Sequence, residues 1–138
     1  MHTNIKRAIG GVTATVTAIG LATALGATPA QAQSNVTAYS NARGGYTSQA
    51  AVTRFTAYGD KITLFDQAAD GAGVHGDWFY TDVNGREYEQ TDLYWGGGAG
   101  TSHTWDFDIP ENVIVTVIAC IRDNGDIIVV TCDVQHSS

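Results

Sequence analysis

Between residues 52 and 134, short runs of β-branched and aromatic residues alternate with turn residues, and this pattern constrains the fold more than any other feature. Alternation of apolar and polar positions is typical of strands with one buried face. No segment of residues 33–138 repeats its apolar positions with the 3.6-residue period of a helix. The expected strands are residues 52–58, 61–65, 74–83, 86–94, 103–109, 113–121 and 127–134. We therefore predict an all-β fold, an antiparallel β-sandwich of about seven strands that is immunoglobulin-like in outline.

Local patterns also predict where some strands lie. The Asn-Gly pairs at residues 84–85 and 124–125 predict two-residue hairpin turns, because both central residues of such turns need a positive φ. Residues 86–94 are polar on both faces, which predicts a strand at the edge of a sheet. Residues 113–121 are apolar on both faces, which predicts a central strand.

Residues 1–32 have the organisation of a secretory signal peptide. A positive pair, Lys6 and Arg7, precedes a long apolar segment, and Ala30 and Ala32 have the spacing that signal peptidase requires. We expect cleavage after Ala32 and therefore a secreted, extracellular protein. The alternative is a transmembrane anchor, because the apolar segment is long enough to cross a bilayer.

The remaining chain would be a small acidic protein. The full sequence has 14 acidic and 7 basic side chains, and cleavage would remove two of the basic ones. Such a charge balance argues against nucleic-acid and membrane partners, which need clustered Lys and Arg. Residues 33–50 lack an apolar period, so we expect a flexible N-terminal tail or an edge strand, and residues 51–138 are expected to form the β-sandwich domain.

Cys120 and Cys132 are the only cysteines of the chain. An even number of cysteines in a secreted protein predicts a disulfide, which here would stabilise the fold by about 3 kcal/mol. A two-residue turn at residues 124–125 does not place these cysteines opposite each other. Either the loop is wider and centred near Asp126, or a β-bulge shifts the register.

Residues 58–132 resemble small secreted β-sandwich proteins of actinomycetes. The matching marks are Tyr58-Gly59-Asp60, Asp66 with Ala69-Asp70-Gly71, Gly98-Ala99-Gly100-Thr101, Ile109-Pro110-Glu111, and the pair Cys120 and Cys132. Some relatives have a further cysteine pair, which is absent here. Proteins of this kind include the adaptor subunit of umbrella-shaped secreted toxin particles, which uses an extended N-terminal tail to join a lectin-like subunit to a scaffold. The resemblance implies that residues 33–50 contact such a partner.

Candidate catalytic side chains are few. Three histidines, His75, His103 and His136, follow residue 32 as possible bases for nucleophilic catalysis. His136 lies near the C-terminus, and His103 alternates with Trp105 on a face that we expect to point into the core. Both cysteines are expected to be oxidised. We therefore expect no catalytic residues and no enzymatic activity.

Acidic turns provide the only candidate metal ligands. Asp66, Asp70, Gly71 and Asp77 fall at positions one, five, six and twelve of a calcium-binding loop. Position three is Ala68 and the flanking segments are expected strands, so an ordinary turn is the preferred interpretation and a weak calcium site the alternative. The histidines lack zinc-site spacing. We expect no metal and no cofactor.

Aromatic residues next to flexible segments are the best candidate contact residues, because Tyr and Trp are favoured at interfaces. They are Tyr39 and Tyr46 in the N-terminal segment, and Tyr94 and Trp95 beside the glycine-rich loop 96–100. We expect a secreted, non-enzymatic binding or adaptor module that contacts another extracellular protein. The alternative is a proteinaceous inhibitor of an extracellular hydrolase.

Overall fold

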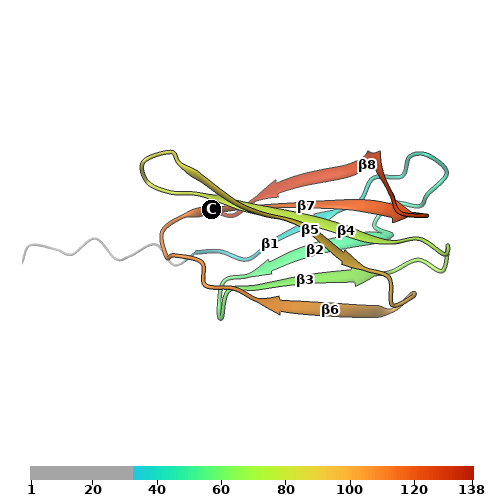
Figure 1. Cartoon of the computed structure of the whole chain (residues 1–138), viewed down its shortest axis with the longest axis horizontal. Helices are drawn as coiled ribbons and strands as arrows, with labels where there is room; N and C mark the ends of the chain where they lie inside the picture. Colours follow the sequence, from blue (N-terminus) through green and yellow to red (C-terminus); the bar gives the residue numbers. More distant parts are fainter. Residues whose placement is uncertain (1–32) are drawn as a thin grey trace, which may run out of the picture.

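The computed structural model describes residues 33–138, so the expected signal peptide at residues 1–32 lies outside the described part of the chain. The described residues form two stacked antiparallel sheets (Figure 1). Their strands are β1 (Val36–Tyr39), β2 (Ala51–Thr56), β3 (Lys61–Asp66), β4 (Gly73–Thr81), β5 (Glu87–Trp95), β6 (Thr101–Asp106), β7 (Ile114–Asp123) and β8 (Asp126–His136). Residues 33–138 contain no helix that is long and apolar enough to span a membrane.

The predicted β-sandwich is confirmed. The first sheet has the order β1-β2-β3-β6 and the second has the order β5-β4-β7-β8. Strand β5 lies at an edge and β7 lies inside its sheet, as their polar and apolar patterns predict. The described strands number eight instead of about seven, because part of the segment 33–50 forms β1.

Apolar side chains from both sheets fill the space between them. Phe55, Ile62 and Leu64 from the first sheet are fully buried, and they face Val74 and Val117 from the second sheet in the same cluster. Successive strand residues point to opposite faces, so Ile62 and Leu64 share the face of β3 that points between the sheets. This alternation fixes which side chains near the strand ends face the space between the sheets.

Part of the segment 33–50 forms an edge strand, β1. An edge strand was the second of the two possibilities, tail or edge strand, that the sequence left open. Residues Val36–Tyr39 pair with β2, and Ala38 is fully buried in the core. Ser40 is also buried, and its hydroxyl accepts a hydrogen bond from the backbone N–H of Ala51 at 3.0 Å. The backbone N–H of Asn41 donates to the carbonyl of Thr131 at 2.7 Å. The segment therefore connects the edges of both sheets.

The two Asn-Gly turns differ. At residues 124–125 both φ angles are positive and Asp123 pairs with Asp126, which is the two-residue turn that was predicted. At residues 84–85 only the glycine has a positive φ, so the prediction of a two-residue turn there is wrong. The Asp82 carboxylate accepts hydrogen bonds from two backbone N–H groups of this loop and thereby stabilises a wider connection.

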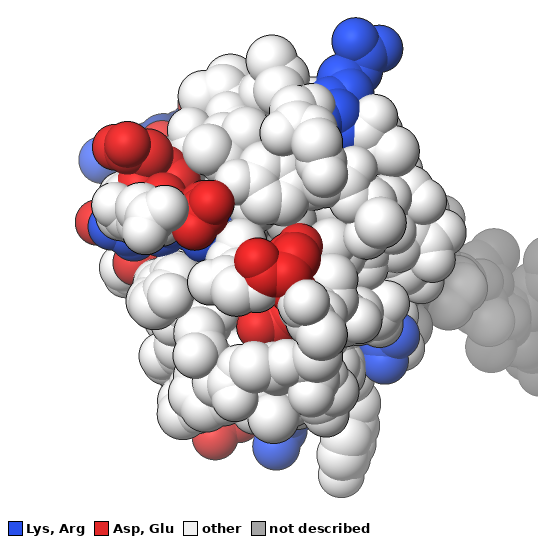
Figure 2. Space-filling model, turned by 90° about the vertical axis from the view of Figure 1, so that its right-hand side faces the viewer, with Lys and Arg blue, Asp and Glu red and all other residues white. Residues whose placement is uncertain are grey.

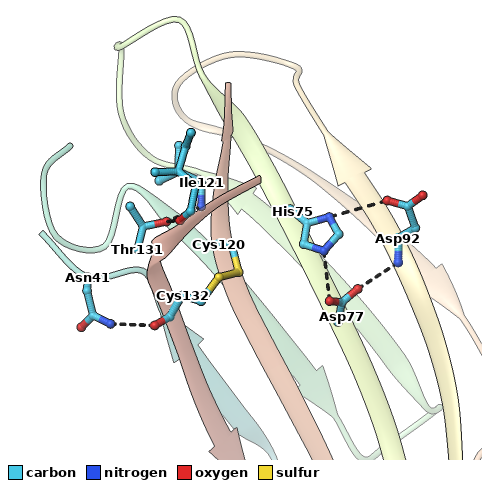
Figure 3. The surroundings of a disulfide bond; sticks show 9 residues. Asn41, His75, Asp77, Asp92, Cys120, Ile121, Thr131 and Cys132 are labelled. Atoms are coloured by element: carbon cyan, nitrogen blue, oxygen red, sulfur yellow. Dashed lines mark hydrogen bonds and ion pairs between the residues drawn. A yellow bond between two sulfur atoms is a disulfide. The ribbon is translucent and has the colours of Figure 1, made fainter. Parts of the chain in front are cut away.

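The disulfide between Cys120 and Cys132 is present, and a β-bulge explains how the two residues meet (Figure 3). Ile121 pairs with Ile128, whereas Ala119 pairs with Asp133, so β8 carries three extra residues between these pairs. Of the two explanations left open by the sequence, the bulge is therefore correct. The cysteines face each other with their Cα atoms 4.2 Å apart.

Candidate functional site

Four loops meet at one end of the sandwich, on the right-hand side of Figure 1. They are residues 40–50, 67–72, 96–100 and 124–125, each of which joins an odd-numbered strand to the next strand. We call this end the loop end. Figure 2 views it directly and shows a largely uncharged face, with acidic side chains near its centre and on its left. Loops that gather at one end of a rigid scaffold are frequent binding sites.

The structure places all four predicted contact residues at or beside the loop end. Tyr39 is the last residue of β1 and is 40% exposed, and Tyr46 lies in the loop 40–50. Tyr94 and Trp95 end strand β5, where Tyr94 is 47% exposed and Trp95 is half-buried. Because neighbouring strand residues point to opposite faces, Tyr94 and Trp95 belong to different surfaces.

Tyr94 is a fixed, exposed aromatic side chain. A Cβ atom built on Gly96 would lie 2.2 Å from the Tyr94 hydroxyl oxygen, and one on Gly73 would lie 2.7 Å from the ring. These two glycines therefore provide the space in which the ring lies against the backbone. The Arg122 guanidinium sits 5.2 Å from the ring centroid and also pairs with Asp92 at 3.3 Å. Tyr94 thus has the exposure and rigidity expected of a contact residue.

A pocket of about 250 Å³ opens between the loops 67–72 and 96–100. Tyr94 forms one wall, and most of the remaining lining consists of alanine and glycine, including Ala68, Ala72 and Ala99. Asp66 is its one acidic lining residue and is only 3% exposed. The pocket is thus a small cavity of mixed polarity with one buried acidic residue in its lining.

Burial raises the pKa of the Asp66 carboxyl above its ordinary value, and the nearby charge of Asp70 raises this pKa further. The backbone N–H groups of Ala68 and Gly98 act in the opposite direction, because they hydrogen-bond the charged form. No Lys, Arg or His within residues 33–138 forms an ion pair with Asp66. The carboxylate therefore lacks a cationic partner in this part of the chain.

Tyr46 is attached to the β7–β8 hairpin. Its hydroxyl group donates a hydrogen bond to the Asp123 carboxylate at 2.7 Å, and its ring packs against the core. This hydrogen bond is the main cause of a raised pKa of Tyr46, because ionisation of the phenol would break it. Tyr46 therefore attaches the loop 40–50 to the scaffold. Less of the Tyr46 side chain is free to contact a partner than the sequence suggested.

A spectroscopic titration should detect this bond. We expect Tyr46 to ionise above its ordinary pKa, so the stabilisation that the bond provides is present below that pKa and is lost as the pH rises through the raised value. The ultraviolet absorbance of tyrosinate, compared with that of Tyr46→Phe, isolates this group. Asp123→Asn should lower the pKa of Tyr46, whereas Asp126→Asn, across the turn, should change it little. Equal effects of the two variants would contradict the assignment.

Trp95 belongs to a row of aromatic rings between β5 and β6. Its ring stacks on His103 at 5.1 Å, and His103 meets Trp105 edge-on at 4.4 Å. The Trp95 indole N–H donates to the hydroxyl of Thr101 at 2.9 Å. His103 was expected to be packed inside the core, and this is wrong: it is exposed, like most residues of β6, which lies at the edge of the first sheet.

A buried histidine lies beside the disulfide on the outer face of the second sheet (Figure 3). The His75 ring is 3% exposed, and its Nε2 atom lies 3.0 Å from the Asp77 carboxylate. Its Nδ1 atom lies 3.8 Å from Asp92, which is too far for a hydrogen bond. The neighbouring cysteines are oxidised, so no thiol is available for this pair to activate.

Neither the arrangement of possible metal ligands nor comparison with known proteins identifies a ligand for this chain. Within residues 33–138 no group of three or more His, Cys, Asp or Glu side chains is arranged to hold a metal ion. The four residues considered for calcium are spread over β3, β4 and the loop between them. No family model matches the chain, and no curated protein or solved structure matches it.

Sequence reasoning did not identify the pocket at Asp66 or the buried pair of His75 and Asp77. The signal for Asp66 was present, because it continues the alternation of Ile62 and Leu64 and therefore faces the space between the sheets. The burial of His75 had no such signal, because it depends on neighbours from adjacent strands.

Proposed function

We propose that this protein is a secreted, non-enzymatic binding module that contacts another extracellular protein through the loop end. The observation that carries the proposal is the exposed Tyr94, held rigid beside a pocket where four loops meet. Rigid aromatic side chains lose little entropy on binding and are frequent hot spots. The disulfide supports an extracellular location, because such bonds persist in oxidising compartments.

In its finer form, the proposal makes the protein an adaptor in a secreted toxin particle. This form rests on the resemblance of residues 58–132 to proteins that include such adaptors. An extended N-terminal tail would then have to leave its partner strand, because Val36–Tyr39 pair with β2 in this structure. Binding through the loop end needs no such rearrangement, and we therefore take it as the primary contact.

Substitution of Tyr94 tests the proposal. Tagged protein comprising residues 33–138 is used to capture partners from culture supernatant, and the captured proteins are quantified by mass spectrometry. We expect Tyr94→Ala to reduce capture of the main partner at least about tenfold, the loss typical of a hot-spot aromatic residue. Tyr58→Ala is the matched control, because Tyr58 is 94% exposed at the opposite end of the sandwich.

The outcomes separate the possible roles. Equal capture by both variants, or loss with Tyr58→Ala alone, would contradict a contact at the loop end. A captured hydrolase whose activity falls on binding would favour the inhibitor. Thermal unfolding of both variants must show that the fold is intact, because Tyr94 also contacts Arg122.

A further inference from the structure

We propose that the pocket at Asp66 accepts an arginine side chain of the protein partner. This inference rests on the proposed function and adds to it the chemistry of the contact. The pocket is defined by Asp66, Tyr94 and the small residues of the loops 67–72 and 96–100. The buried carboxyl group and the size of the pocket both favour binding of a planar cation.

The charge of the pocket comes from Asp66. This residue ends β3 on the face shared with Ile62 and Leu64, so its side chain points between the sheets, toward the mouth that the loops surround. Within residues 33–138, the only hydrogen-bond donors to the Asp66 side chain are backbone N–H groups, of which that of Ala68 is 3.4 Å away. A buried carboxylate without a cation is costly, and a guanidinium group would offset that cost.

The geometry of the carboxylate favours arginine over lysine. A planar guanidinium can form two parallel hydrogen bonds to a carboxylate, whereas an ammonium group acts as a point charge without this matched geometry. The guanidinium group is also more weakly hydrated, so it enters a half-enclosed site at a lower cost.

The lining explains how a long side chain could enter. Most of the lining consists of alanine and glycine, and among the described residues Tyr94 is the one large side chain that lines the cavity. The volume of about 250 Å³ is enough for one side chain but is smaller than most pockets that bind drug-sized ligands. An arginine presented on a partner's surface fits these dimensions.

A titration of the isolated protein tests this inference without the partner. Nα-acetyl-arginine amide is added to ¹⁵N-labelled protein comprising residues 33–138, and the backbone amide shifts of Ala68, Gly96 and Gly98 are followed by NMR. We expect saturable shifts with a dissociation constant of about 1–10 mM, as suits one side chain without the rest of an interface. Nα-acetyl-citrulline amide is the neutral control of the same shape and should produce no saturable shift.

Two variants identify the contact. Asp66→Asn should weaken binding of the arginine probe at least about tenfold, because it removes a charge-assisted hydrogen-bond pair. We expect this variant to fold, because the raised pKa means that the charged carboxyl opposes folding at neutral pH and asparagine can still accept from Ala68. Ala99→Leu, at an exposed loop position, should block the pocket while leaving Asp66 in place.

The inference and the proposed function can fail separately. The inference is overturned if the citrulline amide binds as tightly as the arginine amide, or if Asp66→Asn leaves the titration unchanged. It is also overturned if Nα-acetyl-lysine amide, titrated in the same way, binds as tightly as the arginine amide or more tightly. The capture experiment with Tyr94→Ala and Tyr58→Ala would be unaffected by these results. Conversely, saturable arginine binding at the Asp66 pocket would remain valid if no partner were captured.

Discussion

A chain that begins at Ala51 should lose about 3 kcal/mol or more of its free energy of unfolding, because β1 is part of the sandwich. Its removal would uncover one edge of β2 and leave the backbone N–H of Ala51 without the Ser40 hydroxyl. Removal also takes the buried Ala38 and the part-buried Val36 out of the core, and each lost backbone hydrogen bond costs about 0.5–1.5 kcal/mol. In a domain of this size the loss corresponds to a decrease of roughly 15 °C in the melting temperature.

Substitutions at neighbouring positions of β1 provide a matched test of the same claim. Ala38 is fully buried, so Ala38→Asp places a charge in the core and should destabilise by at least about 3 kcal/mol. Thr37 is half-buried and accepts a hydrogen bond from Arg54, so Thr37→Asp introduces the same charge beside a cation and should change stability little. Urea unfolding of both variants measures the difference.

Hydrogen exchange completes this test. The amides of residues 36–39 should exchange slowly if β1 is bound to β2 in solution. Fast exchange in this segment, together with an unchanged melting temperature of the chain that starts at Ala51, would show that the segment is a free tail. Such a result would also favour the adaptor form in which the N-terminal segment binds the partner.

Periodicity was sufficient to predict the architecture. Alternation of side chains depends on local sequence, so it identified the seven strands from 52 onward, the edge position of residues 86–94 and the central position of residues 113–121. It did not decide the state of residues 33–50, because this segment contributes small or polar side chains such as Ala38 and Ser40, whose burial depends on both sheet edges.

The candidate site was only partly predictable. Tyr94 and Trp95 were predicted as contact residues from their position beside a glycine-rich loop, and the structure places both beside the loop end. Which surface each residue belongs to follows from the sheet, and the exposure of His103 follows from the edge position of β6. Edge positions depend on the order of the strands in each sheet. This order brings together residues that are far apart in the sequence, so local sequence patterns cannot predict it.

The second large effect is expected from the disulfide. Replacement of both Cys120 and Cys132 by alanine should lower the free energy of unfolding by about 3 kcal/mol, the estimate for a loop of this length. The bond also holds β8 in register beyond its bulge. Without it, β8 could continue the register of the turn and place Val130, now 58% exposed, opposite Ala119. A strand that can pair in two registers is less well specified.

The bulged register has a second support, which limits the expected loss. The buried hydroxyl of Thr131 accepts a hydrogen bond from the backbone N–H of Ile121 at 2.9 Å and donates one to the carbonyl of Ile128 at 2.6 Å. Two backbone groups beside the bulge, one on each strand, are thereby satisfied by one side chain. We therefore expect the alanine variant to remain folded, with hydrogen exchange accelerated mainly in residues 129–136.

Reduction of the unmodified protein separates the loss of the covalent bond from the loss of side-chain volume. Cys120 is buried, so alanine substitution also leaves a small cavity, whereas the reduced protein keeps both sulfur atoms. Urea unfolding with and without reductant should show most of the destabilisation in the reduced protein already. If reduction leaves the unfolding midpoint unchanged and the alanine variant is still destabilised, the effect comes from packing and the bond does not stabilise the hairpin. If neither change matters, the Thr131 bonds and the sheet alone determine the register of β8.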